Sequence, residues 1–324
     1  MTDSLRYVLP DPSGPAAALP LLRSAAPELT LAELSAAIDT DKSHILELLA
    51  QHGAVVLRGF ALRSDRDFDA IIRAFDLANF RYVDSLSNAV RSNRTERVFT
   101  ANEAPPHVEI FLHHEMAQTP VYPARLFFFC ERAPQRGGAT PLCRSDLLLE
   151  AMREKQPRFL SRLIDEGLRY TNVMPAKADS SSGQGRSWTS TLGTCDRTEA
   201  EKKLTDLGYD WTWMDAENLR VTTPVLPAVR SAANGAEVFF NQLIAAYKGW
   251  NDARNRGEKA VCFGSGEPLD VKDLAATTAL AEKFTIDLAW ETGDVALVDN
   301  FLMMHGRRPF QGERSILASL VAGD

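Results

Sequence analysis

The stretch "TANEAPPHVEIFLHHEMAQTPVYPARLFFFCERAPQRGGATP", residues 100–141, sets the fold class of this chain. Residues 110–116 and 124–133 have the composition of strands, and the Gly- and Pro-rich residues 135–141 predict a turn after the second one. Similar strand-like segments recur elsewhere, at 54–60, 236–241, 284–290, 294–300 and 314–322. Short strands joined by such turns predict a mainly β protein, a sandwich or a barrel.

Helices are expected to decorate this β core. Thr30 and Glu33 have the spacing of a capping box, which predicts the start of a helix. A second helix is predicted from about Asp41 to His52, and Gly53 is suited to end it. Further helices are predicted after a Ser64 cap, over 145–170 with an interruption at Pro157, and over 270–283.

Two regions differ from the core in composition and apolar pattern. Residues 1–28 are rich in Pro and Ala and predict an extended N-terminal arm. Residues 171–235 look irregular and lack a continuous apolar pattern of their own, which favours an insertion over a second domain. The chain is therefore expected to form a single domain over residues 1–324.

Composition and charge exclude several classes of protein. The chain has 324 residues, a net charge of -7 and an isoelectric point near 5.5, which argues against nucleic acid or anionic lipid as the main partner. No membrane span and no signal peptide are predicted. No two cysteines have CxxC spacing, and free thiols fit a cytoplasmic protein. The sequence does not fix an oligomeric state.

Metal-ligating residues concentrate in the opening stretch. If "LHHEM" is a strand, His113 and Glu115 point to the same side and can bind one metal ion. His305 is the only histidine after His114, and it would complete the two-histidine, one-carboxylate triad of non-haem Fe(II) oxygenases. The pair His107 and Glu109 has the same spacing, and a single His-x-Glu is common by chance, so spacing alone leaves the choice open.

Three blocks in order carry a resemblance to a known family. "HGAVVLRGF" (52–60), the stretch 100–141 and "GDVALVDNFLMMHGRRPFQGERSILASL" (293–320) resemble the TauD/TfdA family of Fe(II)/2-oxoglutarate-dependent dioxygenases, and its clavaminate-synthase-like branch in particular. The resemblance covers roughly residues 50–322, including "FFNQLIAAYKGWNDARN" (239–255). It implies a double-stranded β-helix (jelly roll) core, with 171–235 as a lid-like insertion.

The resemblance also assigns the iron site. It places the metal ligands at His113, Glu115 and His305. It implies that His107, Glu109 and His114 are not metal ligands. The cofactors that it implies are Fe(II), the cosubstrate 2-oxoglutarate, and O2.

The resemblance further implies how 2-oxoglutarate is held. Arg314 falls where family members bind the far carboxylate, which suits the paired donors of a guanidinium group. Thr140 falls at the position of the partner hydroxyl. Many relatives carry a second arginine where this chain has Ser315. Arg307 could reach the pocket or the surface.

The implied reaction is hydroxylation of an aliphatic carbon with release of succinate and CO2. Relatives that halogenate lack the carboxylate ligand, so Glu115 favours hydroxylation, although desaturation or ring formation at the same iron remains open. The expected substrate is a small carboxylate or an amino-acid-like molecule. Arg91, Arg94 and Asn102 could anchor it, although both arginines could equally be solvated. Trp188, Trp211 and Trp213 could line a lid or pack the insertion.

Two other functions stay open at this point. One is an iron- or 2-oxoglutarate-binding protein without turnover, which the combined triad, Arg314 and Thr140 argue against. The other is a zinc hydrolase, for which the sequence has no HExxH helix; GxSxG of a serine hydrolase is also absent.

Overall fold

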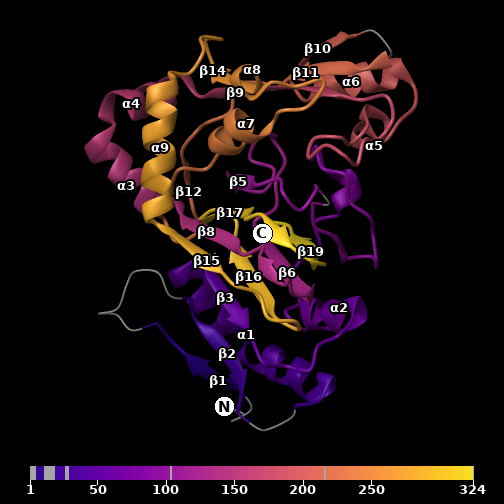
Figure 1. Ribbon diagram of the computed structural model, residues 1–324, viewed down its shortest axis with the longest axis vertical. Coiled ribbons are helices and arrows are strands. Elements are labelled where there is room, and N and C mark those ends of the chain that lie inside the picture. The colour runs from indigo at the N-terminus through magenta and orange to yellow at the C-terminus, as the bar shows by residue number, and fades with distance from the viewer. Residues whose placement is uncertain (1–4, 11–18, 26–28, 103, 215–216, 324) are drawn as a thin grey trace.

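Two β-sheets form the centre of the molecule (Figure 1). The computed structural model describes residues 5–10, 19–25, 29–102, 104–214 and 217–323. The seven-stranded sheet has the order β1 (Leu5–Val8), β2 (Leu21–Ser24), β3 (Ala54–Leu57), β16 (Val295–Asp299), β6 (Arg125–Arg132), β19 (Ser315–Val321), β4 (Phe99–Thr100). The four-stranded sheet has the order β15 (Thr285–Leu288), β8 (Thr140–Arg144), β17 (Met303–Arg307), β5 (Ile110–His113).

One apolar cluster joins these two sheets. It combines buried side chains of the seven-stranded sheet with buried side chains of the four-stranded sheet, among them Val56, Phe128, Leu142, Leu288 and Met303. Because each strand alternates its side chains between two faces, the inward faces of both sheets are apolar. The mainly β core expected from the sequence is confirmed.

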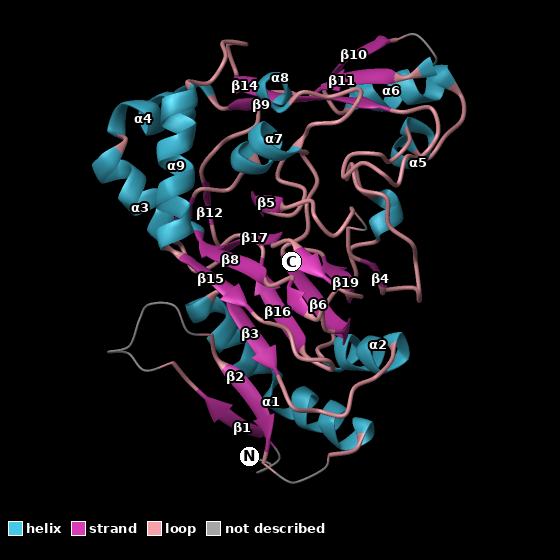
Figure 2. Ribbon diagram, in the orientation of Figure 1, coloured by secondary structure: helices cyan, strands magenta, loops and turns pink. Residues whose placement is uncertain are grey.

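Helices α1 (Leu31–His52) and α2 (Asp65–Ala74) cover the outer face of the seven-stranded sheet (Figure 2). Both begin with a capping box, at Thr30 and Ser64, and α1 ends at Gly53 in the left-handed conformation. The expectation of two helices before Gly53 is wrong: the chain stays helical throughout. Thr40 is exposed and bonds back to Ala36, so the polar residues at this point face solvent without breaking the helix.

A second group of helices covers the outer face of the four-stranded sheet. Helix α3 (Ser145–Lys155) and helix α4 (Pro157–Glu166) are separated at Pro157, as predicted, and α9 (Val271–Lys283) packs with them. Proline is favoured at the first position of a helix, where its missing N–H costs nothing. Helices α7 (Leu243–Gly249) and α8 (Gly257–Ala260) complete this side of the molecule.

The N-terminal residues are part of the seven-stranded sheet. Strand β1 pairs antiparallel with β2, and β2 pairs parallel with β3. The predicted extended arm over 1–28 therefore contains two sheet strands, while its residues 1–4, 11–18 and 26–28 lie outside the described part.

The segment 171–235 has its own regular structure and its own apolar core. It contributes to a third sheet, in the order β10 (Asp210–Trp213), β11 (Leu219–Thr222), β9 (Leu168–Met174), β14 (Val261–Phe263), with helices α5 (Trp188–Leu192) and α6 (Arg197–Asp206) beside it. Its buried cluster includes Met174, Trp188, Leu204 and Val221. The expectation of an irregular segment without an apolar pattern is wrong, because these buried positions are contributed by short elements that sequence periodicity cannot connect.

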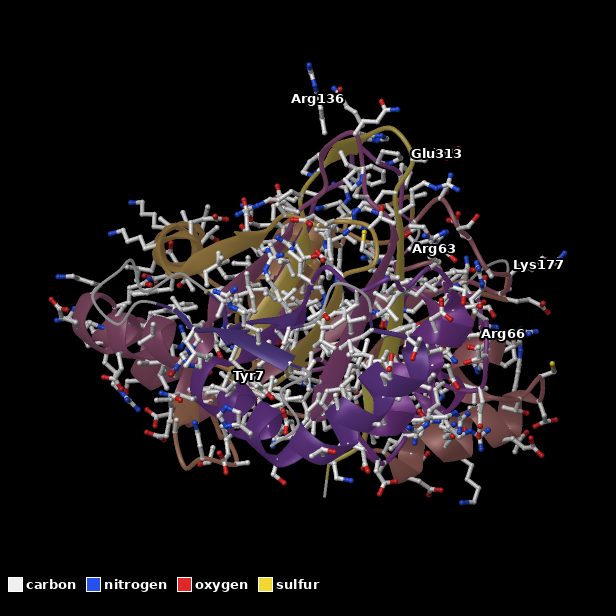
Figure 3. The ribbon with its side chains drawn as sticks, turned by 90° about the horizontal axis from the view of Figure 1, so that it is seen from below. Tyr7, Arg63, Arg66, Arg136, Lys177 and Glu313 are labelled. Carbon is white, nitrogen blue, oxygen red and sulfur yellow. The ribbon has the colours of Figure 1, made fainter. Side chains whose placement is uncertain are left out.

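Short elements complete the described chain: η1 (Tyr82–Asp84) and the small pairs β12 (Arg230–Ser231) with β13 (Glu237–Val238) and β18 (Phe310–Gln311) with β7 (Arg136–Gly137). The strand expected over 236–241 is thus limited to two residues. Charged side chains such as Arg63, Arg136 and Lys177 project from the periphery (Figure 3). Within the described residues, no helix is both long and apolar enough to cross a membrane.

Candidate metal and cosubstrate site

Two histidines face each other across the junction of β17 and β5. His305 and His113 are Cα partners in this antiparallel pair, and their ring centroids lie 4.4 Å apart. Directly opposite residues of an antiparallel pair hold their side chains close together on one face. The strand pairing itself therefore brings two imidazoles together from distant parts of the chain.

Glu115 joins them from a turn. Strand β5 ends at His113, so the expectation that His113 and Glu115 stand on one strand is wrong. The side chain of Asn300 fixes the turn: its Oδ1 accepts from the Glu115 backbone N–H at 2.7 Å, and its Nδ2 donates to the Glu115 carbonyl at 3.0 Å. The carboxylate is thereby placed beside the two rings, with Oε2 3.5 Å from Nε2 of His305.

The three side chains form a group that can hold a metal ion. One ligand atom from each of His113, Glu115 and His305 lies within 4.8 Å of the others. Nδ1 of His113 lies 2.8 Å from the carbonyl of Phe111, which can only accept, so Nδ1 carries the proton and Nε2 is free to bind metal. Burial lowers the pKa of His113 to about 4, so the ring is neutral at pH 7, as a metal ligand must be.

A glycine sets the distance between the two strands. A Cβ atom at Gly306 would lie 2.3 Å from the carbonyl oxygen of Ile110 on β5. The register of the β17–β5 pair also shifts between His305 and Arg307, on either side of this glycine. The backbones can approach this closely because glycine has no side chain.

The rival metal-ligating residues lie elsewhere. His107 is exposed in a turn, and Glu109 pairs with Arg308 at 3.1 Å. His114 is buried behind the site, where its Nδ1 bonds to the carbonyl of Asn300 and its Nε2 lies 3.0 Å from the carbonyl of Phe239. The structure does not bring these three residues into the His113–Glu115–His305 group.

Arg91 pairs with the carboxylate of Glu115. Its Nη2 lies 2.9 Å and 3.1 Å from the two carboxylate oxygens, and its guanidinium group lies over the rings of Tyr82 and Phe99. Burial alone raises the pKa of Glu115, but the charge of Arg91 and the neighbouring His305 outweigh it and lower the pKa below its usual range. Glu115 is therefore ionised at neutral pH. This pairing was not foreseen from the sequence, which only suggested Arg91 as a substrate anchor.

A small cavity extends from the metal-ligating group toward Arg314 and Thr140. Nε of Arg314 donates to the carbonyl of Gly138 at 3.0 Å, and within the described residues no carboxylate pairs with this guanidinium group. Burial, with Arg307 nearby, lowers the pKa of Arg314 to about 10. A half-buried cation without a counter-charge favours an anionic ligand. Thr140 also lines the cavity, and its Oγ1 accepts from Nε1 of Trp290 at 2.9 Å.

Arg307 lines the small cavity and is buried, so it reaches the pocket and not the surface. No carboxylate of the described residues pairs with it, and its guanidinium group donates to the backbone carbonyls of Asn102, Ala104, Pro105 and Val108. Since each carbonyl gains a charged donor, Arg307 fixes the loop that leads into β5.

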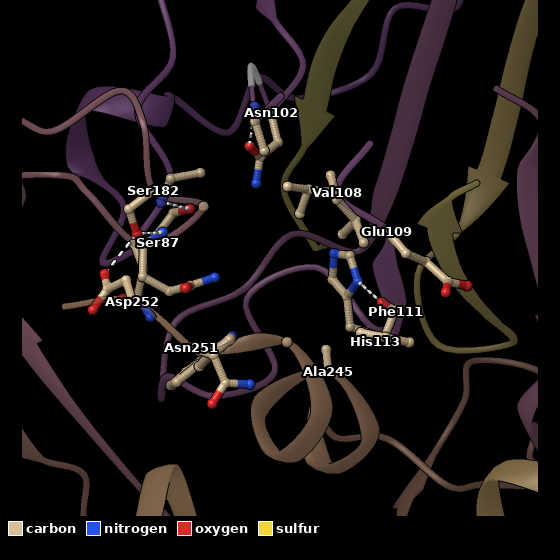
Figure 4. Close-up of a pocket in the computed structure, with 18 of the residues that line it drawn as sticks. Ser87, Asn102, Val108, Glu109, Phe111, His113, Ser182, Ala245, Asn251 and Asp252 are labelled. Carbon is tan, nitrogen blue, oxygen red and sulfur yellow. Dashed lines mark hydrogen bonds between the residues drawn. The ribbon is translucent and has the colours of Figure 1, made fainter. Parts of the chain in front are cut away.

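A larger cavity of about 380 Å³ lies on the other side of His113 and Glu115. Asn102, Asn251 and His113 come from separate segments and surround it (Figure 4). Ser182 and Gln184 bring part of segment 171–235 into its wall. The sequence reasoning missed Asn88 and Gln118 in this wall, because single amides in loops carry no local pattern.

Two groups of predicted residues lie away from this cavity. Arg94 pairs at the surface with Asp65 and Glu131, at 3.1 Å each, and lines neither cavity. Trp188, Trp211 and Trp213 pack in or against the core of segment 171–235, with the rings of Trp188 and Trp213 in edge contact at 5.1 Å. Of the two alternatives for these tryptophans, the structure supports packing.

Comparison with known proteins shows the relatives of this chain. Residues 16–320 match the family described as "Taurine catabolism dioxygenase TauD, TfdA family". A clavaminate synthase-like protein of Arabidopsis thaliana is 39% identical over 95% of this chain and 92% of its own length. The dapdiamide synthesis protein DdaC of Enterobacter agglomerans is 27% identical over 93% of each chain.

Solved structures show the same fold at low sequence identity. PvcB of Pseudomonas aeruginosa is 13% identical with a TM-score of 0.55, over 100% of this chain and 93% of its own. A taurine dioxygenase of Burkholderia xenovorans is 16% identical with a TM-score of 0.52, over 99% of this chain and 90% of its own. Together these similarities support a jelly-roll core built from the two central sheets.

Proposed function

The chain belongs to the TauD/TfdA family and is a 2-oxoglutarate-dependent non-haem iron dioxygenase, and from this premise we propose that it hydroxylates an aliphatic carbon of a small amino-acid-like carboxylate. The observation that supports this reaction is the meeting of a two-histidine, one-carboxylate group with a polar cavity on one side and, on the other, a half-buried arginine that has no carboxylate partner among the described residues. Fe(II) and 2-oxoglutarate, once bound, supply the oxidising chemistry with O2, and succinate and CO2 leave.

His113, Glu115 and His305 are proposed to hold the iron. The donor set fits Fe(II), because two neutral imidazoles and one carboxylate on one side of an ion are the ligands of non-haem iron oxygenases. The backbone carbonyl of Phe111 orients His113, and Asn300 orients the turn of Glu115. Both hydrogen bonds are made within the protein, so the fold itself positions the ligands before any metal binds.

Arg314 and Thr140 are proposed to hold 2-oxoglutarate. The guanidinium group of Arg314 is half-buried and has no carboxylate partner among the described residues, and the far carboxylate of the cosubstrate would supply one. The Thr140 oxygen already accepts from Trp290, so its own O–H is available to donate to the cosubstrate. The apolar side chains of Phe128, Ile316 and Ala318 line the same cavity and keep it dry.

The larger cavity is proposed to bind the substrate. Asn102 lines both cavities, and so does Arg91, which can touch a substrate while it holds Glu115. The cavity wall includes residues of segment 171–235, and we propose that this segment covers the site. Since the residues of the wall are spread from position 87 to position 253, we also propose that the whole chain acts as a single domain. Arg94 is not retained as an anchor, because its partners are at the surface.

A spectroscopic and a turnover measurement test this function together. Under anaerobic conditions, Fe(II) and 2-oxoglutarate should give a weak visible charge-transfer band with the protein. Under air, the same mixture should form succinate slowly, and an amino-acid-like substrate should accelerate that release. Tightly bound zinc with activity independent of O2 would refute the proposal.

A further inference from the structure

Two buried amide side chains in the wall of the larger cavity have atoms without hydrogen-bond partners. Asn88 is 9% exposed and Gln118 is 5% exposed. Among the described residues, no group bonds to Nδ2 of Asn88 or to Oε1 of Gln118, although both residues line the cavity. Buried polar groups in proteins are nearly always paired. Nε of Arg91 is a third unpartnered atom on this wall, but its guanidinium group is already paired with Glu115. The two amides have no such pairing and therefore indicate a ligand that supplies the missing partners.

Other buried amides nearby are used by the fold. Gln242 donates to the carbonyl of His114 at 3.0 Å, and Asn300 holds the turn of Glu115. Asn172 also has an unpartnered Nδ2, but it does not line the larger cavity. Asn88 and Gln118 have unpartnered atoms, whereas Gln242 and Asn300 are bonded to the backbone. Asn88 and Gln118 also line the larger cavity, whereas Asn172 does not.

The backbone holds both amides in place. The N–H of Arg186 donates to the carbonyl of Asn88 at 3.0 Å, and Nη1 of Arg186 donates to the carbonyl of Ser85 at 2.8 Å. Gln118 lies in the turn after Glu115, where the N–H of Thr119 donates to the carbonyl of Met116 at 2.9 Å. Neither segment must be ordered on binding, which lowers the entropic cost of using these amides for recognition.

The charged side chains of the wall already have partners. Asp179 and Asp252 both pair with Arg254, at 2.9 Å and 2.8 Å. Glu109 pairs with Arg308, and Arg91 pairs with Glu115. Neutral amides compensate a buried carboxylate far less well than a cation does. The site near Asn88 and Gln118 is therefore suited to an uncharged polar group.

We propose that Asn88 and Gln118 bind an uncharged carboxamide group of the substrate, an inference that rests on the function proposed above. A carboxamide has both a C=O acceptor and N–H donors, so it can accept from Nδ2 of Asn88 and donate to Oε1 of Gln118. The proposal does not depend on which way each amide is turned, because every orientation offers the ligand one donor group and one acceptor group. Apolar wall residues such as Phe111, Ala245 and Trp250 would contact the aliphatic part.

Matched amides and acids test the inference. L-glutamine and L-glutamate, L-asparagine and L-aspartate, and L-leucinamide and L-leucine would each be added to the Fe(II)-loaded enzyme with 2-oxoglutarate. Anaerobic calorimetry measures binding, and succinate release under air measures turnover. We expect at least one amide to bind about tenfold or more tightly than its acid, because two hydrogen bonds are at stake, and to stimulate succinate release.

Two variants test whether Asn88 and Gln118 cause the tighter binding of amides. Asn88→Asp is nearly isosteric but replaces the donor with an acceptor, and Gln118→Leu removes both polar atoms. Each should weaken amide binding about tenfold or more, with the anaerobic charge-transfer band reporting that iron and cosubstrate are still bound. Asn93→Asp is the matched control, because it makes the same substitution at an exposed residue that lines neither cavity, and it should leave amide affinity unchanged.

The outcomes separate this inference from the proposed function. If every acid binds as well as its amide, or if Asn88→Asp and Gln118→Leu bind amides as well as Asn93→Asp does, the inference is wrong, while uncoupled succinate formation still supports the dioxygenase. If no succinate forms from 2-oxoglutarate with or without added compounds, the proposed function and the inference fail together.

Discussion

His305 lies directly opposite His113 in the β17–β5 pair, and the two ring centroids are 4.4 Å apart. This relationship makes the strand pairing part of the proposed metal site: the two imidazoles meet only if β17 and β5 pair in this register. The third side chain, Glu115, depends on a turn fixed by Asn300, which follows β16. The site therefore combines a cross-strand contact with a turn held by a distant amide.

Replacing His113 should abolish iron binding, whereas replacing His107 should not. His113→Ala removes one of the three side chains that converge, while His107 is exposed in a turn before β5. Iron bound per protein chain, measured after anaerobic loading and desalting, distinguishes the two variants. Equal loss in both would show that the ligand pair has been placed wrongly.

Loss of Arg91 should destabilise the protein, most of all when no metal is bound. Arg91→Met leaves the buried carboxylate of Glu115 without its cation, and breaking a buried ion pair costs about 3–5 kcal/mol. Fe(II) would restore a positive charge beside Glu115, so adding metal should raise the melting temperature more in the variant than in the unmodified protein. Thermal unfolding with and without anaerobic Fe(II) measures both effects.

Arg94→Met is the control for that experiment. Arg94 belongs to the same segment, but its ion pairs with Asp65 and Glu131 are at the surface. Such pairs contribute about 0–1 kcal/mol. A melting temperature that falls as far in Arg94→Met as in Arg91→Met would contradict the special role given to the buried pair.

Arg314→Leu should weaken 2-oxoglutarate binding by roughly 10- to 100-fold, since hydrogen bonds to charged groups contribute about 1.5–3 kcal/mol. The dissociation constant follows from anaerobic titration of the charge-transfer band. Arg132→Leu is a suitable comparison, because Arg132 is exposed and pairs with Glu313. Unchanged cosubstrate affinity in Arg314→Leu would rule this residue out as the carboxylate anchor.

Arg307→Met should loosen residues 104–108, which lead into β5. The variant leaves the carbonyls of Asn102, Ala104, Pro105 and Val108 without their charged donor. The carbonyl of Ala104 is buried, and a buried carbonyl without a partner costs about 1–3 kcal/mol, so the free energy of unfolding should fall by about that much. Hydrogen exchange should increase over 104–108 and stay unchanged in Arg136→Met, an exposed arginine (Figure 3). Unaltered protection in Arg307→Met would refute the role.

Local signals in the sequence predicted the parts of the fold that depend on local chemistry. Thr30 and Ser64 cap helices as expected, Gly53 ends α1, and Pro157 separates α3 from α4. Each of these residues acts on its own backbone or on neighbours within one helical turn. A capping box or a helix-starting proline can therefore be recognised without knowing the fold.

Long-range contacts could not be predicted in the same way. The pairing of Arg91 with Glu115 and the apolar core of segment 171–235 join residues whose separation has no period. The N-terminal strands β1 and β2 gain their stability from pairing with each other and, through β2, with β3, so their Pro- and Ala-rich surroundings gave no strand signal. The convergence of His113, Glu115 and His305 was anticipated because three ordered blocks resemble a family, while the strand alternation used for Glu115 was wrong.

Gly306 has no side chain and carries no charge, yet the geometry of the site depends on this missing side chain. A single added methyl group would collide with the Ile110 carbonyl and force apart the two strands that present the imidazoles. Redesign of this enzyme for other substrates therefore has to keep glycine at the position next to His305, although no side chain there would be expected to recognise a substrate.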